Sequence, residues 1–133
     1  MKTNDLSYFV VWSNAFFIVP LLLAFYADLN KIGFLIGILL TVSMLYHYFD
    51  ENRLKWLDEI LSTLLLIANV YLLHFGEYIP FIYSYGAIFF GLLALYLMHS
   101  YHRGRVWKYD RNHSFWHIST AVVTTLCILV YII

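Results

Sequence analysis

Residues 32–49 read IGFLIGILLTVSMLYHYF, a run that contains no Asp, Glu, Lys or Arg. About 18 consecutive apolar residues in a helix are enough to cross the hydrocarbon core of a bilayer. Inside lipid every backbone N–H and C=O needs a partner within the segment, so we expect this run to be helical. The stretch therefore predicts a membrane-spanning helix that carries two polar residues, Ser43 and His47, near one membrane face.

The rest of the chain repeats this pattern. We interpret residues 8–27, 56–74, 79–100 and 112–133 as further spans. Of the 133 residues, 62% are hydrophobic and only 12% are charged, whereas a soluble domain carries about 25% charged residues. No run has the period-two alternation of membrane β-strands. The sequence predicts a single all-α domain, an integral membrane bundle of about five transmembrane helices covering residues 1–133.

The first run differs from a signal peptide. Its apolar stretch is longer than the usual core of such a peptide, a strong basic segment does not precede it, and no small-residue cleavage site follows. We therefore expect residues 8–27 to stay in the protein as a helix.

The basic residues predict an orientation. With five spans, the N-terminus and the second and fourth loops share one membrane face. That face carries seven of the eight Lys and Arg residues, and the opposite face carries only Lys31. The positive-inside rule then places the N-terminus in the cytoplasm and the C-terminus outside. Because the net charge is near zero, the chain offers no broad cationic surface, and we expect no nucleic-acid partner.

Polar residues gather near the predicted cytoplasmic face. An ionisable group in a membrane helix is costly unless it faces the bundle interior and finds a partner. His113 and His117 are four residues apart and share a helix face, as do Ser43 and His47. These histidines and Asp58 all fall within roughly two turns of the same membrane face. Three imidazoles with a nearby carboxylate suit a catalytic Zn²⁺ site with an open position for water. The sequence predicts His47, His113 and His117 as its ligands.

Other polar residues are candidates to support this site. Asn14 and Ser13, about two turns into the first span, either hydrogen-bond to the ligands or pack the helix. Asp50 in the second loop is either a capping residue or a support for the site. Ser62 lies four residues after Asp58 and is a candidate hydrogen-bond partner of that carboxylate. Asn69 is deeper, and we interpret it as a helix-packing residue.

The order Ser43-x-x-x-His47, then Asp58, then His113-x-x-x-His117 resembles the signature of the CREST superfamily of zinc-dependent transmembrane hydrolases. That group includes the alkaline ceramidases, the progestin and adipoQ receptors and the myomaker-like proteins. The resemblance covers the second, third and fifth spans. Family members generally have seven helices, so this chain looks like a shortened member. The shortening removes helices that would line the lipid cavity in the family, and a homodimer that completes the cavity in trans is one alternative.

The resemblance implies a zinc-dependent intramembrane hydrolase of a lipid amide or ester, either ceramidase-like or phospholipase-like. Asp58 would then be the general base acting on a zinc-activated water, Ser43 would orient that water or the oxyanion, and the substrate would be a membrane lipid. A non-catalytic receptor or structural protein stabilised by zinc is the main alternative, and a haem protein is another. Only Asn4-Asp5 remains of the acidic N-terminal calcium site of the alkaline ceramidases, so we do not predict calcium.

Overall fold

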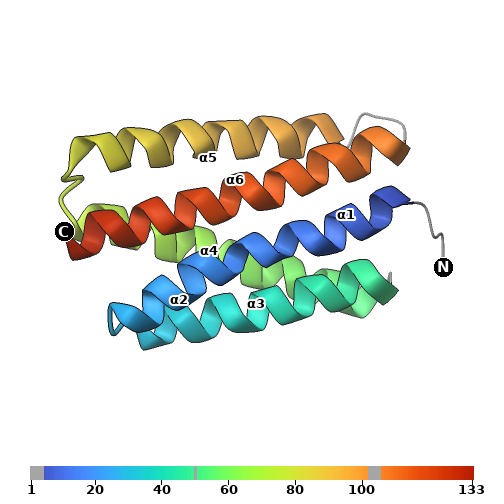
Figure 1. The fold of residues 1–133 in the computed structure, drawn as a ribbon, viewed down its shortest axis with the longest axis horizontal. Helices are drawn as coiled ribbons and strands as arrows, with labels where there is room; N and C mark the ends of the chain where they lie inside the picture. The colour runs from blue at the N-terminus through green and yellow to red at the C-terminus, as the bar shows by residue number, and fades with distance from the viewer. Residues whose placement is uncertain (1–4, 50, 102–105) are drawn as a thin grey trace.

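The computed structural model describes residues 5–49, 51–101 and 106–133, and the regular structure of these residues is entirely helical (Figure 1). The elements in chain order are α1 (Asp5–Ser13), the 3-10 turn η1 (Asn14–Phe17), α2 (Ile18–Tyr26), α3 (Asn30–Phe49), α4 (Asn52–Phe75), α5 (Phe81–Tyr101) and α6 (Val106–Ile132). Five helical segments are long and apolar enough to cross a membrane: Tyr8–Tyr26, Asn30–Phe49, Asn52–Phe75, Phe81–His99 and Asp110–Ile132. The chain is a multi-pass membrane protein, and the prediction of an all-α bundle with five transmembrane helices is confirmed.

The first span is one helical rod with a tightened turn, η1, between α1 and α2. Pro20 in α2 has no N–H, and its ring crowds the carbonyl four residues earlier, at Phe16. A short 3-10 segment takes up such a disturbance. At the junction, Ser13 Oγ donates to the Val10 carbonyl at 2.7 Å and Asn14 Nδ2 donates to the same carbonyl at 3.2 Å. The junction therefore carries two buried polar side chains.

Two helices begin a full turn or more before the spans that the hydropathy predicts. α4 begins at Asn52 rather than at residue 56, and α6 begins at Val106 rather than at residue 112. The added residues are mostly polar or charged, and Lys and Arg are good helix formers. Hydropathy locates the membrane core, whereas the helix continues into the interfacial layer for as long as its backbone bonds persist.

α6 lies at the centre of the bundle and packs against α1, η1, α2, α4 and α5. α3 packs against α1, η1, α2 and α4. α5 lies along α6 at the edge of the bundle (Figure 1) and makes extensive contact with no other described helix. Near the C-terminal end of α6, a Cβ on Gly76 would lie 2.7 Å from the Val130 carbonyl oxygen, so a side chain is excluded where the end of α4 meets α6.

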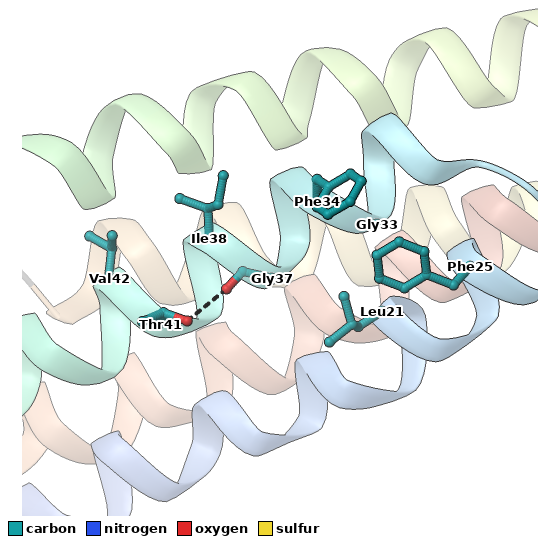
Figure 2. Close-up of a pocket in the computed structure, with 8 residues that line it drawn as sticks. All are labelled: Leu21, Phe25, Gly33, Phe34, Gly37, Ile38, Thr41 and Val42. Atoms are coloured by element: carbon teal, nitrogen blue, oxygen red, sulfur yellow. Dashed lines mark hydrogen bonds between the residues drawn. The ribbon is translucent and has the colours of Figure 1, made fainter.

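Two hollows interrupt the packing. The first, which we call the α2–α3 groove, has a volume of about 470 Å³ and is lined by the eight residues in Figure 2. The second, the α4–α5 cavity, has a volume of about 750 Å³ and is bordered by η1, α3, α4, α5 and α6. Its lining includes Ser43, Asp58, Asn69, Gly91 and His117. Because α4 and α5 do not pack against each other, this cavity lies where two consecutive spans are separated.

Candidate metal centre

Three histidines converge at the end of the bundle that holds the start of the chain. His47 is in the last turn of α3, while His113 and His117 lie one turn apart on α6. One ring nitrogen from each lies within 4.8 Å of the other two, so the group could hold a metal ion. His47 Nε2 and His113 Nε2 are 3.1 Å apart. Two nitrogens bound to a tetrahedral metal at 2.0–2.1 Å lie about 3.3 Å apart, so this pair already has the spacing of ligands.

Ser13 determines which nitrogen of His117 is available. The single hydroxyl proton of Ser13 goes to the Val10 carbonyl, at 2.7 Å. Ser13 Oγ is also 2.9 Å from His117 Nδ1, and since the hydroxyl has no second proton, His117 Nδ1–H must be the donor in that bond. Nδ1 then carries the ring proton, and Nε2 holds a lone pair. His117 is only 1% exposed, and its Nε2 has no hydrogen-bond partner among the described residues. A metal-binding histidine is typically oriented by such a bond through its other nitrogen.

Asp58 and Ser43 form a second polar pair in the same cavity. Asp58 is 6% exposed on α4 and Ser43 is 3% exposed on α3. The Ser43 side chain hydrogen-bonds to the Asp58 carboxyl group. Asp58 Oδ1 has no hydrogen-bond partner in the part of the chain that the structure describes. Both residues line the α4–α5 cavity together with His113 and His117. The carboxylate thus faces the same space as two of the three imidazoles.

Asp58 stands apart from the ligand group itself. Its carboxylate oxygens are not part of the set of ligand atoms that lie within 4.8 Å of one another. Three nitrogens alone leave a tetrahedral metal with an open position. A carboxylate that lines the same cavity but is outside the ligand group could act on a molecule in that position.

The residues predicted to support the site differ in where the structure places them. Asn14 is buried and lines the cavity, and its Oδ1 has no hydrogen-bond partner among the described atoms. Ser62 is half-buried and also lines the cavity. Asp50 lies outside the described residues. His74 is exposed at the opposite end of α4 from Asp58, and so remains apart from the cluster.

Sequence reasoning weighed Ser13 only as one of two neighbouring polar residues. Its partner His117 is 104 positions away, and no spacing rule relates the rotation of the first helix to that of the last. Two aromatic rings also lie against the histidines. The centroid of Tyr46 lies 4.5 Å from that of His47, and the centroid of Trp116 lies 5.3 Å from that of His113. Both rings are close to these histidines in the sequence, at i,i+1 for Tyr46 and i,i+3 for Trp116.

Comparisons of the chain with protein-family models, with curated proteins and with solved structures give no match. The resemblance to the CREST superfamily therefore stays a prediction that rests on five residues and their order.

Proposed function

We propose that this protein is a zinc-dependent intramembrane hydrolase that cleaves a lipid amide or ester. The observation that carries the proposal is the state of His117. Its Nδ1–H is held by Ser13, its buried Nε2 has no hydrogen-bond partner among the described residues, and its ring belongs to a group of three close imidazoles. A buried nitrogen lone pair without a donor is destabilising unless a ligand fills the position.

Zinc suits this donor set better than other common cations. Three imidazole nitrogens with an open fourth position are typical of catalytic zinc, whereas calcium and magnesium prefer oxygen ligands. When bound in such a site, zinc lowers the pKa of a water towards about 7 and polarises a carbonyl group. His47, His113 and His117 would hold the ion.

The remaining roles fall to Asp58 and Ser43. Asp58 takes the proton of the attacking water and passes it to the leaving amine or alcohol, as a general base and then a general acid. Its unpartnered Oδ1 supports this role, because that oxygen can accept the proton without breaking the contact with Ser43. Ser43 holds the carboxylate in place, or turns its hydroxyl towards the developing oxyanion.

The shape of the α4–α5 cavity supports a lipid substrate. Asp58, His113 and His117 line it together with apolar side chains such as Leu65, Leu92 and Leu95. The lack of extensive contact between α4 and α5 would give an acyl chain a lateral path from the bilayer. We place the N-terminus and the metal centre at the cytoplasmic face, because seven of the eight basic residues belong to that side of the predicted topology.

The alternatives find less support. A structural zinc site would be closed by a fourth protein ligand, and Asp58 is not in the group of close ligand atoms. In a haem protein the macrocycle separates its two axial imidazoles. Here the three ring centroids lie 4.6, 4.7 and 5.1 Å apart, too close to admit a porphyrin between them. A homodimer remains a prediction of the shortened scaffold.

The test is incubation of the purified zinc-loaded protein with a mixed membrane lipid extract, followed by mass spectrometry. Removing a general base typically lowers the rate by about 10²–10⁴-fold. We therefore expect the wild type to release fatty acid and Asp58→Asn to release almost none while it keeps its zinc. Glu51→Gln is the matched control, since Glu51 is an exposed carboxylate just before α4 that does not line the cavity. Equal release by Asp58→Asn, or no lipid consumed by the wild type, would refute the proposal.

A further inference from the structure

The α4–α5 cavity continues well beyond the metal centre. On α4 its lining includes Asp58, Ser62, Leu66 and Asn69, which recur every three or four positions as one helix face requires. Asn69 comes eleven residues after Asp58, which corresponds to about 16 Å along the helix. On the facing helix α5, a Cβ added to Gly91 would meet nothing within 4 Å. The cavity is therefore long enough to hold the middle of an extended acyl chain.

Asn69 places a polar group in this otherwise apolar section. The residue is 3% exposed. Its Nδ2 donates to Thr124 Oγ1 at 3.0 Å, and that hydroxyl donates in turn to the Thr120 carbonyl at 3.0 Å. This chain of bonds fixes the amide with its NH₂ group towards α6. The carbonyl oxygen Oδ1 is left buried with no hydrogen-bond partner among the described residues.

The neighbouring hydroxyl groups do not supply the missing donor. Thr63 Oγ1 donates to the Glu59 carbonyl at 2.8 Å, and Thr120 Oγ1 donates to the Trp116 carbonyl at 2.8 Å. A buried water needs two to four polar partners, and apolar side chains form most of the surroundings. A packing role alone accounts for the NH₂ group of Asn69 but not for its oxygen, which lacks a donor.

We propose that Asn69 is a specificity-determining residue, whose Oδ1 accepts a hydrogen bond from a hydroxyl group in the middle of the substrate's acyl chain. This deepens the proposed function and rests on it for one point, that the lipid head group lies at the Asp58 end. A site that offers a buried polar group discriminates strongly against the analogue that lacks the matching group. The enzyme would thus prefer mid-chain hydroxylated lipids over plain saturated ones.

The test measures binding rather than turnover, so that it is independent of hydrolysis. The full chain carrying Asp58→Asn is titrated, with and without zinc, with three probes: stearic acid, stearic acid hydroxylated in mid-chain, and its alpha-hydroxy isomer. We expect the mid-chain isomer to bind about tenfold more tightly than the other two, which corresponds to one net hydrogen bond. Equal affinity for the three probes would overturn the inference, and this comparison needs no substitution at position 69.

Adding Asn69→Leu should remove the preference while leaving the affinity for stearic acid in place. The matched control is Ser84→Ala. Ser84 is also buried in a span, and its hydroxyl has no hydrogen-bond partner within the described part of the chain. It lies outside the cavity, so its removal should leave the tenfold preference unchanged. Persistence of the preference in Asn69→Leu would assign the hydroxyl to another residue and reject our proposal. If the preference holds but the wild type cleaves no lipid, the proposed hydrolase fails and the binding inference stands.

Discussion

The α2–α3 groove and the α4–α5 cavity differ in whether the polar atoms of their lining residues have hydrogen-bond partners. In the α2–α3 groove, the one lining residue with a polar side chain is Thr41, and its hydroxyl donates to the Gly37 carbonyl at 2.9 Å (Figure 2). In the α4–α5 cavity, His117 Nε2, Asp58 Oδ1 and Asn69 Oδ1 all lack a partner among the described residues. Both hollows are bordered by membrane-spanning helices, and both are large.

Volume alone therefore does not identify a site. A groove whose hydroxyl is satisfied by its own helix can be filled by lipid tails without cost, since those tails are as apolar as its walls. Buried acceptors in a membrane are costly unless something donates to them or binds to them. Of these two hollows, only the α4–α5 cavity is lined by residues whose buried polar atoms lack a partner among the described residues, and so it is the one that suits the proposed ligand.

The largest effect should come from removing a ligand. We expect His117→Ala to lose stoichiometric zinc, because two imidazoles cannot hold the ion as three do. The control is His74→Ala, whose histidine is exposed at the far end of α4. Metal content of both purified variants, measured by mass spectrometry of the element, checks this. Full zinc occupancy in His117→Ala would mean that His117 does not hold zinc. The α4–α5 cavity would then lose its main distinction from the α2–α3 groove.

A smaller loss should follow from Ser13→Ala. This change removes the hydrogen bond at 2.9 Å that holds His117 Nδ1–H, and loss of such a support typically costs 10–100-fold in metal affinity. Ser114→Ala is the matched control, because that fully buried serine lies beside His113 but donates to the Asp110 carbonyl of its own helix. Zinc affinity from competition with a chelator distinguishes the two. Equal affinities would mean that Ser13 only packs the first helix.

The residues in these predictions differ in how far the sequence alone predicts their roles. The convergence of His47, His113 and His117 could be predicted, because hydropathy gives the depth of each residue and a four-residue spacing gives its helix face. The roles of Ser13 and Asn69 could not be fully predicted. Each depends on how two distant helices are rotated about their own axes, and packing sets that rotation. For Asn69 the packing interpretation holds for the NH₂ group, which donates to Thr124, but it missed the oxygen left in the cavity.

The separation of α4 from α5 also could not be predicted from the sequence. Consecutive membrane helices joined by a short turn are usually neighbours, and nothing in the apolar pattern of either span says otherwise. Both spans have small or apolar residues on every face, so the sequence does not show whether α5 packs against α4 or α6. The packing is decided by how well the helix surfaces fit along their whole length. The α4–α5 cavity exists because α5 packs against α6 and not against α4, so its volume could not be predicted from the composition of the chain.

The smallest effect, and the most direct comparison of the hollows, comes from filling each with the same side chain. A Cβ on Gly91 meets nothing within 4 Å, and one on Gly37 meets only Leu21 Cδ1 at 3.6 Å, so a Cβ fits at both positions without a backbone clash. Gly91→Leu occupies the path of the acyl chain, and we expect about tenfold slower turnover of long-chain lipids. Zinc content should not change, and short-chain substrates should be cleaved at the wild-type rate.

Gly37→Leu fills the groove that has no unsatisfied polar atom, and turnover should change by less than about twofold. Rates on one long-chain and one short-chain substrate for the two variants are sufficient to check this. If Gly37→Leu slowed the long-chain reaction as much as Gly91→Leu, the acyl chain would lie in the α2–α3 groove. The unpartnered oxygen of Asn69 would then need another explanation, since nothing in that groove reaches it. A selective loss in Gly91→Leu would instead connect the metal centre, the apolar section and Asn69 as parts of one binding site.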